Sequence, residues 1–134
     1  MPIDYAVEPQ LNAAEFRAVL VASTLAARRP ADDVVRLDKM LREADIIITA
    51  RNAGRLVGVS RAITDFSFCC YLSDLAVDTA YQAQGIGKRL VEETHRVAGE
   101  ATTLILLAAP AAATYYKKIG LQHMPNCWAI PHIR

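Results

Sequence analysis

The sequence predicts a single α/β domain over residues 1–134, with a mixed, mostly antiparallel central sheet flanked by about four helices. Three observations lead to this prediction. The chain has 134 residues and is 53% hydrophobic, which suits one domain with its own core. Strand-like and helix-like patterns follow one another along the chain, and no repeat, low-complexity segment or linker separates them.

The first third of the chain predicts one strand and two helices. Residues 2–7 can form a short strand. Asn12 precedes Glu15 at the spacing of a helix cap, and the helix that follows carries on one face Phe16, Leu20 and Thr24. Arg28-Arg29-Pro30 ends this helix. A second helix is expected over residues 31–44, and its core face would hold Val34, Leu37, Met40 and Leu41.

The middle of the chain predicts three antiparallel strands. Residues 46–50 and 56–63 read as strands joined by a turn at residues 52–54, which ends in glycine. A further turn near residues 64–65 leads into a third strand over residues 66–77. These strands form the body of the expected sheet.

The last third predicts two helices, a buried strand and a hairpin. Gly99 is a natural end for the first helix, and residues 102–107 read as a fully apolar, buried strand. Pro110 begins the last helix and Gly120 ends it. The tail is expected to fold around Pro125-Asn126 as a small hairpin of residues 121–124 and 127–130.

The stretch from Tyr71 to Gly87 has the form of an anion-binding site. A strand ends near Val77, and after a polar turn Gly85 and Gly87 open a helix. The first backbone N–H groups of a helix have no partner within it, and the helix dipole makes that end partly positive. Glycine lets an oxyanion approach these groups closely, and Lys88 adds positive charge.

Two glycines are also compatible with an ordinary tight turn. The sequence does not fit the Walker motif, because Arg89 stands where that motif needs Ser or Thr. It does not fit the dinucleotide motif either, because Leu90 takes the place of the third glycine. The residues around the turn therefore decide its interpretation.

Two sequence blocks carry a family resemblance. Gln82, Gly85 and Gly87 match the loop Gln/Arg-x-x-Gly-x-Gly/Ala, which follows a strand ending like Asp74-Leu75-Ala76-Val77. Residues 112–121 follow the block Ala-x-x-Phe/Tyr-Tyr-x-x-x-Gly-Phe, with Leu for the last Phe. In these blocks, their order and their spacing, the sequence resembles the GNAT superfamily of N-acetyltransferases, and the predicted order of elements agrees with the GNAT fold.

This resemblance implies acetyl-CoA as co-substrate. The two strands that carry the blocks would splay apart, and the pantetheine arm would enter the gap and pair with the backbone of Leu75, Ala76 and Val77. The pyrophosphate would lie on the loop formed by Gln82, Ala83, Gln84, Gly85, Ile86, Gly87 and Lys88. One departure is Ala109, which stands where the family often has an Asn that contacts the cofactor.

The implied chemistry is attack of an amine on a thioester. Asp74 is the candidate base, with Ser73 and Tyr71 holding a relay water. A bulge, frequent in this strand of the family, would decide whether Ser73 or Asp74 faces the cleft, and Asp74 is equally compatible with a structural role at that bulge. Tyr116 occupies the family position of the acid that protonates the leaving thiolate, while Tyr115 would pack.

The acceptor site is the least determined part. The resemblance places it over the connection between the first two helices and near the last hairpin, where Arg29 and Trp128 are candidates. Arg61 and Tyr71 are further candidates on the sheet strands. Surface charge and helix capping explain most such residues better than acceptor binding does. His123, Cys127 and His132 lack a fourth ligand, so no metal site is expected.

Composition limits the other partners. The formal net charge of +1 does not suggest nucleic acid, and no apolar run is long enough to predict a membrane span. Three cysteines do not make a disulfide framework, which favours a reducing cytoplasm. A homodimer formed through the final hairpin is a family expectation.

The sequence therefore predicts an N-acetyltransferase that moves an acetyl group from acetyl-CoA to the primary amine of a small molecule, directly and within a ternary complex. Two alternatives stay open. A non-catalytic acyl-CoA sensor would keep residues 82–87 without needing Asp74 or Tyr116. An enzyme acting on a protein or on charged tRNA would need a large basic or grooved surface.

Overall fold

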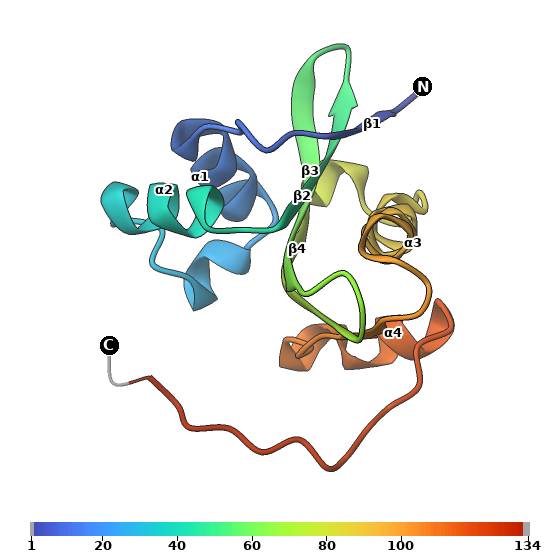
Figure 1. Ribbon diagram of the computed structural model, residues 1–134. Coiled ribbons are helices and arrows are strands. Elements are labelled where there is room, and N and C mark those ends of the chain that lie inside the picture. Colours follow the sequence, from blue (N-terminus) through green and yellow to red (C-terminus); the bar gives the residue numbers. More distant parts are fainter. Residues whose placement is uncertain (1, 133–134) are drawn as a thin grey trace.

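The computed structural model describes residues 2–132, and a five-stranded sheet forms its centre (Figure 1). The strands lie in the order β1–β5. They are β1 (Asp4–Val7), β2 (Ile46–Asn52), β3 (Arg55–Thr64), β4 (Cys69–Val77) and β5 (Thr103–Ile105). Neighbours from β1 to β4 are antiparallel, and β5 is parallel to β4. The mixed, mostly antiparallel sheet predicted from the sequence is confirmed.

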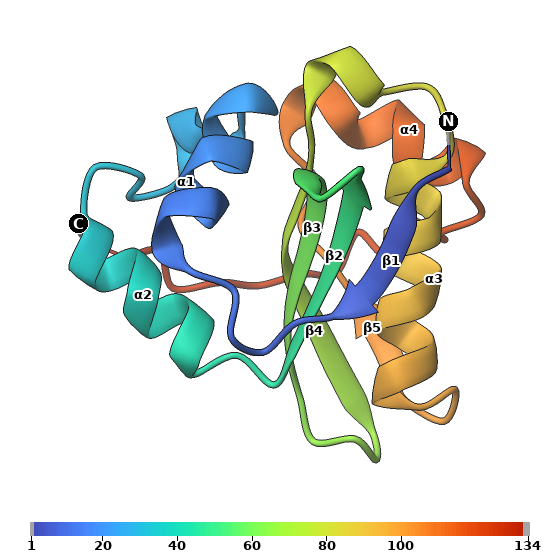
Figure 2. The same ribbon diagram turned by 90° about the horizontal axis from the view of Figure 1, so that it is seen from above.

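Helices cover both faces of the sheet. The helices of the described residues are α1 (Ala13–Ala22), α2 (Val34–Arg42), α3 (Ile86–Ala98) and α4 (Ala113–Lys118), with short 3₁₀ turns η1 (Leu25–Arg28), η2 (Thr79–Tyr81) and η3 (Pro110–Ala112). Figure 2 shows α1 and α2 on one side of the strands and α3 on the other. One core cluster joins Phe16 and Leu37 to Val59, and a second joins Leu90 to Ile48.

Two side-chain caps set where the first helices begin. The Asn12 side chain accepts the Glu15 backbone N–H at 2.7 Å, as predicted. The Asp33 side chain accepts the Arg36 backbone N–H at 3.0 Å, so α2 starts three residues later than predicted. Val34, at the first turn of α2, is exposed rather than part of the core. Thr24 lies beyond α1 and is exposed, because the chain turns there through a left-handed conformation with φ of 73°.

A β-bulge in β4 reverses the faces of the strand. Cys70 packs in the cluster beneath α3, whereas Ala76 packs in the cluster beneath α1 and α2, although regular alternation would put both on one face. Arg61 is opposite Asp74, and Ala62 is opposite Leu72, so Ser73 is the extra residue. The bulge turns Asp74 toward the layer of α1 and α2.

The strands β4 and β5 stay paired over only three residues each. Cys69–Tyr71 pairs with Thr103–Ile105, and no described residue continues the ladder on this edge of β4 beyond Tyr71. The predicted strand over residues 102–107 is therefore too long, and it is not buried, since Ile105 and Leu107 are exposed. The parting of β4 from β5 leaves backbone groups of residues 73–77 open on one side.

The predicted C-terminal hairpin is wrong. No strand forms in the described residues beyond α4, and the tail leaves the body as an extended chain in which Trp128 is 93% and Ile130 98% exposed (Figure 1). A hairpin is marginal by itself, and the three-residue β5 offers it little edge to join. The expected homodimer stays a prediction, but without the hairpin that was to form it.

None of the helices within residues 2–132 combines the length and the apolarity needed to cross a membrane.

A buried hydroxyl pair fixes α3 to the sheet and provides a stability test. Thr94 donates to the Leu90 carbonyl at 2.7 Å, so Ser60 on β3 donates to Thr94 at 2.6 Å. We expect Thr94→Val to lower the free energy of unfolding by about 1 to 3 kcal/mol, because it leaves the buried Ser60 hydroxyl without its acceptor.

Ser60→Ala is the matched control. It should cost less than Thr94→Val, because Thr94 keeps its bond to Leu90, and the double variant should recover part of the loss. Chemical denaturation of the three variants measures this order. Equal losses for both single variants would contradict the assigned direction of the bond.

Candidate functional site

The loop before α3 leaves the first turn of that helix without a side-chain cap. Gly85 is the N-cap residue at φ of 82°, and a Cβ placed there would meet no atom within 4 Å. The starts of α1 and α2 carry Asn12 and Asp33 as caps instead. The N-cap residue therefore satisfies none of the first backbone N–H groups of α3, and the anion site that the sequence predicts here stays a prediction.

Two polar side chains fix this loop to the end of β4. Gln82 donates to the Val77 carbonyl at 3.1 Å. The Asp78 carboxylate accepts the Ala80 N–H at 2.9 Å and pairs with Arg55 at 3.2 Å. The family residue Gln82 thus links the loop to the strand edge that the sequence assigns to pantetheine.

Tyr115 reaches the start of α3 from α4. Its hydroxyl lies so close over Gly87 that a Cβ there would stand 2.3 Å from the phenol oxygen. Burial raises the pKa of Tyr115, while a hydrogen bond from the Lys88 backbone N–H lowers it. The sequence predicted only packing for Tyr115, and it assigned Gly87 to the cofactor. The structure adds a phenol beside the predicted pyrophosphate position, and its O–H proton is available to a further acceptor.

The two cations at the start of α3 take different directions. The Arg89 guanidinium lies 4.5 Å from the centroid of the Tyr5 ring and pairs with Glu93 at 3.5 Å, which directs it toward β1. Lys88 is exposed. Lys88 is thus the basic side chain that remains available to a ligand at the start of α3.

A cluster of charged residues forms on the other side of the bulge, and we call it the arginine cluster: Arg29, Arg61, Ser73 and Asp74. The Nε–H groups of both arginines donate to Asp74, one to each carboxylate oxygen. Arg29 Nη2 also donates to the Ser73 carbonyl at 2.7 Å, and Arg61 Nη2 donates to the Ser73 hydroxyl at 3.1 Å. The structure therefore brings together four residues that the sequence placed in the site.

These contacts bear on the role of Asp74. Its side chain is 0% exposed, and each oxygen accepts a charged donor. In this arrangement the carboxylate does not reach a cleft, which favours the structural alternative left open by the sequence. The donors are guanidinium groups rather than the backbone N–H groups expected at the bulge. The general-base role of Asp74 stays an untested prediction.

Tyr116 packs beside Tyr115, and the positive charge of Arg29 acts on its phenol. Its ring packs edge-on against Tyr115, with centroids 5.3 Å apart and planes at 71°. Burial raises the pKa of Tyr116, as does the neighbouring Tyr115, while the positive charge of Arg29 lowers it. The net shift is upward, so the phenol keeps its proton at neutral pH. A protonated phenol between the glycine loop and the arginine cluster has the form required of an acid.

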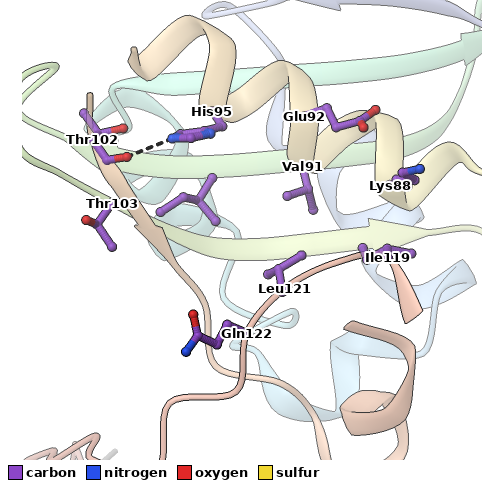
Figure 3. Close-up of a pocket in the computed structure, with 10 residues that line it drawn as sticks. Lys88, Val91, Glu92, His95, Thr102, Thr103, Ile119, Leu121 and Gln122 are labelled. Atoms are coloured by element: carbon purple, nitrogen blue, oxygen red, sulfur yellow. Dashed lines mark hydrogen bonds between the residues drawn. The ribbon is translucent and has the colours of Figure 1, made fainter. Parts of the chain in front are cut away.

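A pocket of about 350 Å³ lies between α3, β5 and residues 119–122 (Figure 3). Apolar side chains of Val91, Leu104, Ile119 and Leu121 line it, and Glu92 and Gln122 stand among the polar residues. At one end of the pocket, His95 Nε2 forms a hydrogen bond with the Thr102 carbonyl at 2.8 Å. The sequence did not predict this pocket, because its walls come from three segments that share no motif.

Two predicted acceptor residues lie apart from the arginine cluster. Tyr71 is exposed on β4 before the bulge, and no described contact joins it to the cluster. Trp128 lies in the exposed tail. Among residues 2–132, no group of three His, Cys, Asp or Glu side chains is placed to hold a metal ion.

The structural role of Asp74 generates a stability prediction. Asp74→Ala should lower the free energy of unfolding by about 3 to 5 kcal/mol, because it leaves two largely buried guanidinium groups facing each other. Asp32→Ala is the control: it removes an aspartate from an exposed pair with Arg17 and should cost about 1 kcal/mol or less. A stable Asp74→Ala protein without turnover would instead support a chemical role.

Comparisons with known proteins agree with this geometry. A family model described as "Acetyltransferase (GNAT) domain" matches residues 43–122, which is more than half of the chain. Histone acetyltransferase TAP1 of Glycine max is 33% identical over 74 residues, which are 54% of this chain and 32% of that protein. The chain thus spans about a third of that relative's length.

Two solved structures have the same fold. A protein of methicillin-resistant Staphylococcus aureus, described as a probable acetyltransferase, superposes with a TM-score of 0.80, at 20% identity and 99% coverage of both chains. The aminoglycoside N-acetyltransferase AAC(6′)-Iy, solved in complex with CoA, superposes with a TM-score of 0.76, at 13% identity, covering 99% of this chain and 96% of that one. By its family match, its fold and its glycine loop, this chain belongs to the GNAT acetyltransferase family.

Proposed function

We propose that this protein transfers the acetyl group of acetyl-CoA to the primary amine of a small molecule, by direct attack of the amine within a ternary complex. The parting of β4 from β5 beside the start of α3 carries this proposal. The unpaired edge of β4 leads to the start of α3, whose N-cap residue has no capping side chain. A long ligand with an amide-containing arm and a phosphate-containing end matches both features.

The residues present fit such a ligand. Backbone groups of Leu75, Ala76 and Val77 face no strand on the β5 side, apart from the Val77 carbonyl, which Gln82 occupies. Gly85 leaves room for an oxyanion at the helix start, and Lys88 adds charge. The proposed cofactor site is therefore the strand edge of residues 75–77 together with the loop of residues 82–88.

The chain's own groups then assist the transfer. Bound acetyl-CoA supplies the acetyl group as a thioester, and the reaction forms a C–N bond as the C–S bond breaks. A backbone N–H near Leu75 or Ala76 stabilises the negative charge that develops on the thioester oxygen. Tyr116 gives a proton to the leaving thiolate. The amine loses its proton to a water relay near Ser73, because Asp74 is occupied by its arginines.

The activities for which similar proteins are named support this class of reaction. AAC(6′)-Iy is an aminoglycoside N-acetyltransferase solved with CoA, and TAP1 of soybean is a histone acetyltransferase. Their acceptors differ from each other, and the structural likeness is at 13% identity. The acceptor of this chain has to be argued from its own residues.

A titration followed by an activity assay tests the proposal as a whole. Calorimetry with acetyl-CoA and with free CoA measures binding, and thiol release across a panel of amines and a histone peptide measures transfer. Binding with thiol release supports the enzyme. Binding without release from any acceptor would favour a non-catalytic acyl-CoA sensor, and absence of binding would contradict both.

The glycine loop provides the first specific prediction. Gly85→Glu should weaken acetyl-CoA binding by about 100-fold or more, because its carboxylate would oppose the pyrophosphate at the start of α3. Calorimetric titration measures the change.

Gly54→Glu is the matched control for that variant. Gly54 in the β2–β3 turn has φ of 85° and no atom within 4 Å of a built Cβ, so it shares the backbone strain, the free space and the added charge. It should retain normal affinity. Equal affinity of the two variants would remove the loop from the proposed site.

Tyr116 provides the second specific prediction. Tyr116→Phe should reduce kcat about 100-fold and change the Kd for acetyl-CoA by less than about threefold, because it removes only the proton donor. Tyr115→Phe removes the neighbouring hydroxyl at the start of α3 and should show the opposite pattern, with affinity reduced and kcat kept. An unchanged kcat in Tyr116→Phe would make Tyr116 a packing residue.

A further inference from the structure

We infer that Arg29 binds an oxyanion, a carboxylate or a phosphate, on the acceptor, so that this protein acetylates amines that carry negative charge rather than polycationic amines. This inference rests on the proposed acetyl transfer. It follows from the charge, the free donors and the position of the arginine cluster.

The arginine cluster carries an excess positive charge. Two guanidinium groups share the single carboxylate of Asp74, and the side chains of Arg61, Arg29 and Asp74 are 9%, 22% and 0% exposed. A partly buried charge without a counter-ion is unfavourable, and an incoming anion would neutralise it. The cluster is therefore complementary to an anion and repels a cation.

Arg29, rather than Arg61, is exposed enough to receive that anion. Arg61 uses three of its five N–H groups, on Asp74, on the Met40 carbonyl at 3.4 Å and on the Ser73 hydroxyl, and its side chain is only 9% exposed. Of the five N–H groups of Arg29, the described contacts use three, on Asp74, on the Arg28 carbonyl at 2.8 Å and on the Ser73 carbonyl. Two N–H groups remain on the more exposed of the two side chains, and a guanidinium fork suits a carboxylate or phosphate.

The position of Arg29 puts the anion next to the proposed chemistry. Its guanidinium donates to the carbonyl of the bulge residue Ser73. An acceptor held by its anionic group on Arg29 would therefore lie beside the bulge in β4, next to the water relay proposed near Ser73. Arg29 is a specificity-determining residue in this arrangement.

The nearby acidic residues do not offer a site for a polycation. Asp32 is exposed and already pairs with Arg17 at 3.2 Å. Asp33 caps α2, and Asp74 is enclosed by the cluster. An acceptor with several ammonium groups would meet the excess charge of the arginines, and the two carboxylates in the connection from η1 to α2 are already engaged.

Matched acceptors test the inference. We compare amino acids with their C-terminal amides, and phosphoethanolamine with ethanolamine, and we use spermidine and neamine as polycations. Thiol release should give kcat/KM values at least about tenfold higher for the anionic member of a pair, mainly through KM. The amino-acid pairs report a carboxylate, and the phosphoethanolamine pair reports a phosphate.

Variants of Arg29 assign the effect to its charge. Arg29→Gln leaves Asp74 paired with Arg61, so the fold should persist, and thermal unfolding checks this. It should raise KM for the anionic acceptor about tenfold or more relative to any change for the neutral partner, and Arg29→Lys should restore part of the loss. Arg28→Gln removes an adjacent charge outside the cluster and should behave like the unaltered protein.

Binding provides a readout independent of turnover. Calorimetry of the anionic amine with the protein alone should show affinity that Arg29→Gln removes.

Three outcomes would overturn the inference and leave the acetyltransferase proposal intact. They are equal use of both members of every pair, preference for spermidine or neamine, and an equal effect of Arg29→Gln on both members. Failure of acetyl-CoA binding would overturn that proposal, and failure of every anionic amine to bind or react would overturn the inference.

Discussion

The buried carboxylate of Asp74 joins three parts of the chain that are remote in sequence. Asp74 lies on β4, Arg61 lies on the neighbouring β3, and Arg29 follows η1 on the other layer. A carboxylate without exposed surface is unfavourable unless charged donors compensate it, and here Arg61 and Arg29 each satisfy one of its oxygens. The connection between α1 and α2 is thereby fixed to the bulge, and the acceptor side of the site takes its shape from that attachment.

The bulge at Ser73 gives β4 two functions along one strand. Before it, residues 69–71 pair with β5, and after it, residues 73–77 keep an open edge beside the glycine loop. The extra residue also turns Asp74 to the face of α1 and α2, where Arg29 can reach it. The same irregularity therefore separates the charged cluster on one face from the open strand edge that leads to α3. On α4, Tyr115 reaches the start of α3 at Gly87, and Tyr116 packs edge-on against Tyr115.

Features set by neighbouring residues could be predicted from the sequence. The Asn12 cap, the succession of strands and helices along the chain and the glycine loop before α3 all follow from local patterns, and two blocks of residues were enough to indicate the family. The partners of Asp74 could not be predicted, since Arg29 is 45 residues away and the bulge decides which way the carboxylate points. The Tyr115 contact at Gly87 and the pocket beside α3 likewise come from distant segments. The hairpin failed because its alternating residues had no sheet edge long enough to join.

The fold of this chain and the acceptor it selects depend on different parts of the structure. The strand edge and the start of α3 are backbone features of a fold that this chain shares with solved structures about 13% to 20% identical to it. The acceptor side depends on side chains, and here two guanidinium groups outnumber one carboxylate. A polycationic acceptor would have to overcome that excess charge in a partly dehydrated site, where electrostatic interactions are stronger than in water. Likeness to an aminoglycoside acetyltransferase therefore shows a shared fold, while the local charge favours a different class of amine.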